Sequence, residues 1–176
     1  CDVARFGSDK TVIFVFDGLR VVKIKTFDKS SVVEVADEIR RLQTEYSVNL
    51  HNIIVDEDGV GGGVKDILRC KGFVNNSKPL KNENYQNLKT QCYYKLADLI
   101  NKGQVSIDTK DINIRQYVIE ELEQVCMHHP DKDNKLQIVP KDTVKAILGR
   151  SPDFSDALAM RCYYEIDSNY GRYFVQ

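Results

Sequence analysis

The chain has 176 residues, of which 42% are hydrophobic and 29% are charged, a balance typical of a globular protein and not of a disordered or fibrous one. This length suits one domain and is too short for two large ones. The formal net charge of -1 excludes a strong overall positive field, so any contact with nucleic acid would depend on local clusters of Lys and Arg.

The cysteine pattern favours free thiols over a disulfide framework, because the cysteines are odd in number, scattered and never spaced as CxxC. Cys126 lies near His128 and His129, but two further ligands at suitable spacing are missing, so we do not expect a zinc site. No apolar run approaches the ~20 residues needed to span a membrane, and no signal peptide is visible. The five cysteines are Cys1, Cys70, Cys92, Cys126 and Cys162.

The first elements are predicted to be three antiparallel strands in a row. Residues 1–4 have the pattern of a strand end, and we expect the beginning of this strand to be missing. After a turn at 6–9, two β-rich runs at 11–16 and 19–26 are separated only by Asp17-Gly18. An Asp-Gly pair between such runs is a strong hairpin signal.

A helix, a buried strand and a second helix are expected next. Ser30 or Ser31 caps a helix that reaches about Tyr46, because apolar residues recur there at intervals of three or four. Residues 52–55 predict a buried central strand that ends at Asp56. The glycine-rich run 59–63 is predicted to form a turn before a helix at 64–71.

The second half of the chain alternates helices with short strands. We expect a surface loop at 72–87, a helix at 88–102 closed by Gly103, a strand at 105–107, a helix at 112–125 and a strand at 136–139.

The last two helices are separated by a short turn. Pro140 precedes a helix that begins at Lys141 and ends at Gly149. The final helix is expected to have Ser151 as N-cap and Pro152 at its first position. The whole order predicts a single α/β domain over residues 1–176, with a mixed sheet and helices on both faces.

Three aspartates are expected to converge. Asp2 ends the first strand, Asp56 ends the fourth, and Asp156 lies on the last helix; functional groups gather at strand ends where the topology changes direction. Clustered carboxylates repel one another, so such a cluster favours bound cations, and hard oxygen ligands suit Mg²⁺ or Mn²⁺. Two such ions ~4 Å apart can stabilise the attacking and leaving oxygens of a phosphodiester displacement.

Each aspartate also has a purely structural interpretation. Asp2 could simply precede a turn, Asp56 could begin a solvated turn, and Asp153 suits the positive end of a helix dipole. Asp156 is harder to explain in this way, because it shares an apolar helix face with Ala159, where an unpaired charge is costly.

The glycine run 59–63 does not have the ending of a phosphate-binding P-loop, since no Gly-Lys-[Ser/Thr] follows it. We expect its glycines to let the backbone come close either to the helix that follows or to a nucleic-acid phosphate.

These motifs resemble the nuclease motifs of phage terminase large subunits. Residues 2–11 (DVARFGSDKT) are similar to the family's first motif, roughly D-x-A-x-x-G-x-D. Residues 55–56 followed by 59–61 resemble the second motif. Residues 141–142 followed by 148–159 resemble the third motif, which is the most specific.

The resemblance runs nearly end to end, because residues 87–89 and 93–96 also fit the family's helix between the second and third motifs. It implies a ribonuclease H-like fold and a two-metal endonuclease that cuts concatemeric viral DNA during packaging. The implied metal ligands are Asp2, Asp56 and Asp156, with Asp153 as a fourth. Asp9 matches the second aspartate of the first motif, and we interpret it as turn-forming.

The resemblance also implies partners. A complete large subunit carries an ATPase motor in the same polypeptide, and this chain has no P-loop, so we expect it to be the nuclease part only. Double-stranded DNA, the terminase small subunit and the portal protein are the other implied partners. The implied location is the cytoplasm of an infected host cell.

Basic residues that flank the acidic motifs could contact DNA phosphates, which fix register without reading bases. A solvated, charge-balanced surface is the alternative for each of them. These candidates are Arg5, Lys10, Lys141, Lys145 and Arg150.

Other functions are compatible with parts of the pattern. Another ribonuclease H-like enzyme, such as a junction resolvase or a transposase, would use similar acids, although the Gly-Arg-Ser-Pro-Asp run argues against both. A module that docks DNA or the portal would bind without metal-dependent cleavage. An actin-like nucleotide-binding fragment would need a second, matching half, which this chain is too short to supply.

Overall fold

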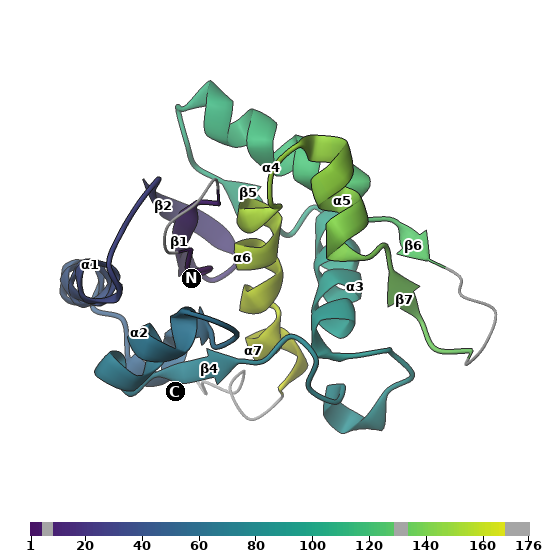
Figure 1. Ribbon diagram of the computed structural model, residues 1–176, viewed down its shortest axis with the longest axis horizontal. Coiled ribbons are helices and arrows are strands. Elements are labelled where there is room, and N and C mark those ends of the chain that lie inside the picture. The colour runs from purple at the N-terminus through teal and green to yellow at the C-terminus, as the bar shows by residue number, and fades with distance from the viewer. Residues whose placement is uncertain (5–8, 129–133, 168–176) are drawn as a thin grey trace.

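A set of short strands forms the centre of the fold, with helices on both faces (Figure 1). The computed structural model describes residues 1–4, 9–128 and 134–167; the predicted turn at 6–9, apart from Asp9, and the residues Arg5 and His129 lie outside them. β1 (Thr11–Asp17) pairs antiparallel with β2 (Arg20–Phe27), as the Asp-Gly signal predicted.

The remaining strands pair with β2 or with one another. β2 pairs in parallel with β5 (Ser106–Ile107), and β3 (Ile54–Asp56) pairs in parallel with β4 (Lys71–Phe73). A separate small hairpin joins β6 (Met127–His128) to β7 (Gln137–Ile138).

Cys1 and Asp2 join the two larger groups of strands into one mixed sheet. Asp2 and Val12 exchange two backbone hydrogen bonds of 2.9 Å in an antiparallel bridge. On the other side, the Cys1 backbone nitrogen donates to the Ile54 carbonyl (2.8 Å), and the Asp56 N–H donates to the Cys1 carbonyl (3.0 Å). The predicted succession of three antiparallel strands is therefore confirmed, and the first of them lies between β1 and β3.

One face of the sheet is covered by α1 (Val32–Glu45) and α2 (Gly61–Leu68). The predicted start of α1 is confirmed, because Ser31 and Glu34 form a capping box in which each side chain accepts from the other residue's backbone N–H. The apolar side chains of α1 pack against Ile13 and Val15 of β1. A short 3₁₀ helix (Leu50–Asn52) leads into β3.

The start of α2 corrects the sequence prediction. The helix begins at Gly61, inside the glycine run, and not at residue 64. A Cβ added at Gly61 would lie 1.8 Å from the Asp56 carbonyl oxygen, so the expected close backbone approach occurs here, against the strand that carries Asp56. Residues 71–73 were also predicted wrongly, since they form β4 and pair with β3.

The other face is covered by α3 (Leu88–Asn101), α4 (Ile112–Gln124), α6 (Asp153–Arg161) and α7 (Tyr163–Ile166), whose apolar residues form a second core with Val12 and Phe14. A 3₁₀ turn (Leu80–Asn82) precedes α3. In Figure 1, α6 runs through the middle of the molecule, and its residues from Asp153 to Met160 are all buried. Because α6 is enclosed on every side, its two aspartates are buried and are not solvent-exposed surface residues.

The start of α6 also differs from the prediction. α5 (Lys141–Leu148) ends at Gly149 with a φ of 70°, as expected, but α6 begins at Asp153, and neither Ser151 nor Pro152 provides a side-chain cap. The N–H of Ser155 instead donates to Glu121 of α4 (2.7 Å). A carboxylate from a distant helix therefore replaces the local cap.

All five cysteines are free. No helix among the described residues is long and apolar enough to cross a membrane.

The Glu121 carboxylate is fully buried and binds both Ser155 N–H and the Arg150 guanidinium. We predict that Glu121→Ala lowers the free energy of unfolding by about 3–5 kcal/mol, because it leaves a guanidinium without its buried partner. Denaturation in urea measures this loss. Glu120→Ala, which removes the more exposed Arg150 partner, is the matched control and should cost much less. Equal losses in the two variants would contradict the capping role of Glu121.

Candidate active site

The four predicted acids lie together at one end of the sheet. Asp2 and Asp56 belong to adjacent extended segments, joined by the hydrogen bond between Cys1 and Asp56. Asp153 and Asp156 come from the first turn of α6. The charges of Asp156, Asp153 and Asp56 all raise the pKa of Asp2, after the larger effect of its burial. The fold therefore brings the four carboxyl groups within electrostatic reach of one another.

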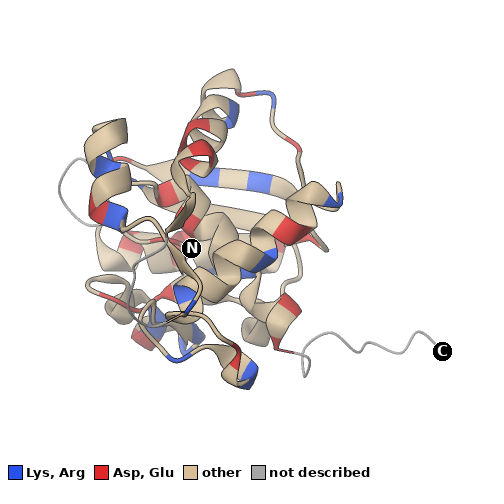
Figure 2. Cartoon of the chain, turned by 90° about the vertical axis from the view of Figure 1, so that its right-hand side faces the viewer, with Lys and Arg blue, Asp and Glu red and all other residues tan. Residues whose placement is uncertain are grey.

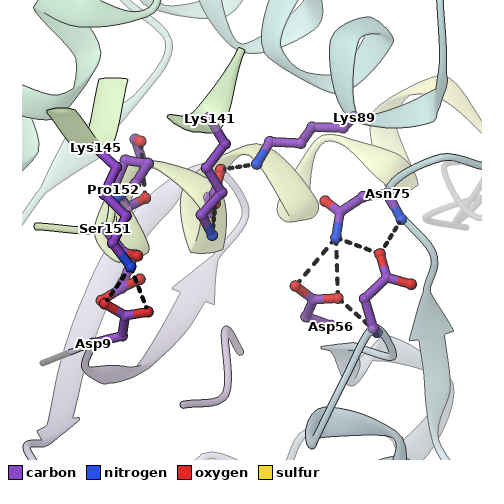
Figure 3. A network of polar contacts seen from close by, with 12 residues as sticks. Asp9, Asp56, Asn75, Lys89, Lys141, Lys145, Ser151 and Pro152 are labelled. Atoms are coloured by element: carbon purple, nitrogen blue, oxygen red, sulfur yellow. Dashed lines mark hydrogen bonds and ion pairs between the residues drawn. The ribbon is translucent and has the colours of Figure 1, made fainter. Parts of the chain in front are cut away.

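Asp156 is buried, with an exposed fraction of 6%, and is held by three side chains. Lys89 Nζ and Tyr93 Oη lie 2.6 Å from its Oδ1, and Lys141 Nζ lies 2.9 Å from its Oδ2. Figure 3 shows the two lysines. Burial alone would raise the pKa of Asp156, but the two lysines outweigh burial and lower the pKa to about 2. Asp156 is therefore ionised across the physiological range.

The pKa of Lys141 is shifted in the opposite direction to that of Asp156. Burial disfavours its charge, yet the carboxylates of Asp156 and Asp2 outweigh burial and raise the pKa of the Lys141 ammonium. The pair is thus a stable ion contact in which both partners keep their charge.

Asp2 is the least satisfied of the acids. Its exposed fraction is 6%, and its Oδ2 has no hydrogen-bond partner among the described residues. Burial and the charge of Asp156 raise the pKa of Asp2 well above its usual value. Buried polar atoms without partners are rare and costly, so this oxygen fits the ligand set of a hard divalent cation.

Asp56 is bound by neutral donors. The Asp58 N–H donates to its Oδ1 (2.9 Å), and the Asn75 amide nitrogen lies 3.2 Å from both of its oxygens (Figure 3). Burial raises the pKa of Asp56, although these hydrogen bonds act against that rise. Asp56 is therefore held in a fixed orientation by neutral hydrogen-bond donors among the described residues.

Asp153 and Asp9 connect the first motif to the third. The backbone N–H of Lys10 donates to Asp153 Oδ2 (2.7 Å), and Lys145 Nζ lies 3.1 and 3.2 Å from the two oxygens of Asp9. Burial is the main cause of the raised pKa of Asp153. Asp9, which we interpreted as turn-forming, therefore also ties its segment to α5 through Lys145.

The acids as they stand do not form a finished metal site. Within residues 1–4, 9–128 and 134–167, no group of three Asp, Glu, His or Cys side chains is arranged to hold a metal ion. Asp156 is occupied by Lys89 and Lys141. The donor set fits a divalent cation in chemistry, but these contacts would have to change for all of the acids to bind one.

The predicted DNA contacts all have partners within the chain wherever the structure describes them. Lys141 and Lys145 contact Asp156 and Asp9, and Lys10 contacts Asp28. Arg150 binds Glu120 and Glu121, and its guanidinium lies 4.4 Å from the centre of the Tyr117 ring. Figure 2 shows Lys and Arg among Asp and Glu on several elements. Phosphate contacts by these residues stay a prediction.

The sequence analysis did not assign roles to Lys89, Tyr93 or Asn75. Lys89 and Tyr93 are four residues apart on α3, a spacing that places both on one helix face, but nothing in that spacing points to Asp156. Asn75 lies in a stretch that we predicted to be a surface loop. Only the packing of α3 and β4 beside the acids reveals these three residues.

Comparison with known proteins finds similar solved structures but no match at the level of sequence. No protein-family model and no curated protein matches the chain. The nuclease domain of the large terminase subunit gp2 of bacterial virus Sf6 aligns with a TM-score of 0.76 and 23% identity, over 91% of this chain and 84% of that one. The large terminase nuclease from thermophilic phage G20c aligns with a TM-score of 0.61 and 18% identity, over 92% and 78%.

The chain has the fold of the phage large-terminase nuclease domains. A third such domain, from Thermus phage P74-26, aligns with a TM-score of 0.57 and 19% identity over 96% of this chain and 80% of that one. The predicted ribonuclease H-like α/β class is therefore confirmed, and the resemblance seen in the motifs extends to the fold. Structures of a mutant of the Sf6 domain include one with manganese and one with calcium.

The low pKa of Asp156 gives a prediction with a definite sign. Because the pKa falls from its usual 3.8 to about 2 on folding, the stabilisation is present above pH 3.8 and is lost as the pH falls toward 2. Lys89→Met should therefore cost about 1.5–3 kcal/mol at neutral pH, the range for hydrogen bonds to charged groups. This cost should shrink between pH 4 and pH 2.

Urea denaturation of wild type and variant over this pH range measures the difference. Lys102→Met, which removes an exposed lysine that pairs with Asp98, is the control and should change stability little. A loss in Lys89→Met that is independent of pH would contradict the ion contact with Asp156.

Proposed function

We propose that this chain is a metal-dependent DNA endonuclease domain of the terminase type, which cuts concatemeric viral DNA during genome packaging. The observation that carries the proposal is the meeting of Asp2, Asp56 and the α6 acids at one end of a terminase-nuclease fold, with Asp2 Oδ2 buried and without a partner. Structures of similar domains contain manganese or magnesium, and the carboxylates here have suitable chemistry for the same ions.

In this proposal, Asp2, Asp56 and Asp156 would hold two Mg²⁺ or Mn²⁺ ions, with Asp153 as a fourth ligand. When bound, such ions supply an activated water and stabilise charge on the leaving oxygen of the phosphodiester. Tyr93 orients Asp156 through its hydroxyl (2.6 Å). The chain itself therefore provides the ligand charge and its orientation.

The lysines around Asp156 have two proposed uses. Without bound cations, Lys89 and Lys141 neutralise a buried carboxylate that would otherwise be costly. The Lys141 side chain is 42% exposed, so it could turn from Asp156 to a DNA phosphate once the carboxylate has another partner. Lys10, Lys145 and Arg150, together with Arg5, remain proposed phosphate contacts.

The proposal also includes a substrate, partner proteins and a cellular location. Double-stranded DNA would be the substrate, and an ATPase domain of the same polypeptide, the terminase small subunit and the portal protein would be partners. The reaction would take place in the cytoplasm of an infected host cell.

Cleavage of supercoiled plasmid tests the proposal. Wild type should nick or linearise the plasmid with Mn²⁺ or Mg²⁺ and be inactive in EDTA. Asp56→Ala should lower the rate by on the order of 10²-fold or more, as expected when a group that supports transition-state charge is removed. Its stability without metal should be unchanged or slightly higher, because repulsion among the acids is relieved.

Asp37→Ala is the matched control, because Asp37 is exposed on α1; it should cleave like wild type. Undiminished cleavage by Asp56→Ala would remove Asp56 from the site. Cleavage restricted to branched DNA would instead indicate a resolvase, and DNA binding without cleavage in any metal would indicate a docking module.

A further inference from the structure

We propose that Asn75 is a positioning residue that orients the Asp56 carboxylate for cation binding, an inference that rests on the function proposed above. Asn75 lies just after β4, which pairs in parallel with β3. The Glu57 N–H donates to the Phe73 carbonyl (2.8 Å), so the segments that follow the two strands run side by side. This pairing places Asn75 next to Asp56.

The side-chain amide of Asn75 contacts Asp56 at the end of β3 and Asp58 in the turn that follows. Its nitrogen lies 3.2 Å from each oxygen of Asp56 and 2.7 Å from Asp58 Oδ2. The backbone N–H of Asn75 also donates to Asp58 Oδ2 (3.0 Å). Asp58 therefore fixes Asn75 from two directions, and Asn75 in turn fixes Asp56.

The chemistry of this donor differs from that around Asp156. Lys89 and Lys141 neutralise Asp156, so they compete with a cation for that carboxylate. An amide is neutral, so it orients Asp56 without placing a competing positive charge beside that carboxylate. A carboxylate has about four lone-pair sites, and the two donors on Asp56 leave sites for a cation (Figure 3).

This arrangement has a measurable consequence for cation affinity. Groups that hydrogen-bond to metal ligands typically change metal affinity or activity by about 10- to 100-fold when they are removed. Asn75→Ala should therefore weaken Mn²⁺ binding to the DNA-free chain by about 10- to 100-fold, measured by isothermal titration calorimetry. Asn101→Ala, at the exposed end of α3, is the matched control and should bind like wild type.

A second variant separates positioning from a general loss of structure. Asn75→Asp keeps the size of the side chain but replaces the donor with a negative charge beside Asp56. In EDTA its thermal midpoint should fall below that of Asn75→Ala, because like charges repel. Added Mn²⁺ should raise the midpoint of Asn75→Asp by more than that of wild type, since the extra carboxylate attracts the cation, whereas Asn75→Ala should show a smaller rise than wild type.

Relative to wild type, the Mn²⁺-induced rise of the thermal midpoint should therefore be larger in Asn75→Asp and smaller in Asn75→Ala. A merely structural role of Asn75 would not produce these opposite changes. Wild-type Mn²⁺ affinity in Asn75→Ala, or equal Mn²⁺-induced shifts in the two variants, would overturn the role of Asn75. Asp56→Ala distinguishes this failure from failure of the proposed function. If Asp56→Ala binds Mn²⁺ like wild type, the metal site itself is wrong; if it loses binding while Asn75→Ala does not, only the positioning role is wrong.

Discussion

The ion contacts of Asp156 with Lys89 and Lys141 connect most of the parts that surround the candidate site. Asp156 lies on α6, which is buried on every side, and an uncompensated charge there would be strongly destabilising. Lys89 brings α3 to the carboxylate, and Lys141 brings the start of α5. Tyr93 completes the set from one turn further along α3. The packing of three helices is therefore coupled to the charge state of one residue.

The sheet supplies the other half of the site through a short segment at its centre. Cys1 and Asp2 hydrogen-bond to Val12 on one side and to Ile54 and Asp56 on the other. This pairing places Asp2 and Asp56 on adjacent extended segments, and the glycine at position 61 lets the next helix begin directly against the Asp56 backbone. The backbone positions of both acids thus follow from hydrogen bonding between extended segments.

The acids are compensated in three different ways. Lysines neutralise Asp156, amide and backbone N–H groups hold Asp56 without neutralising it, and one oxygen of Asp2 has no partner among the residues described. This uneven compensation leaves carboxyl oxygens of Asp2 and Asp56 as the atoms proposed to bind a cation. This asymmetry links the geometry to the proposed metal-dependent chemistry.

The sequence by itself determined the local elements and indicated which acids would lie close together. The Asp17-Gly18 hairpin, the capping box of α1 and the glycine end of α5 follow from interactions within a few residues, and strand ends indicated Asp2 and Asp56. Only the tertiary structure decided which groups compensate the acids and how α6 begins. Asn75 contacts Asp56 from 19 residues away, and Glu121 caps α6 from 34 residues away. Such partners depend on how whole elements pack, and no local pattern of residue types encodes that packing.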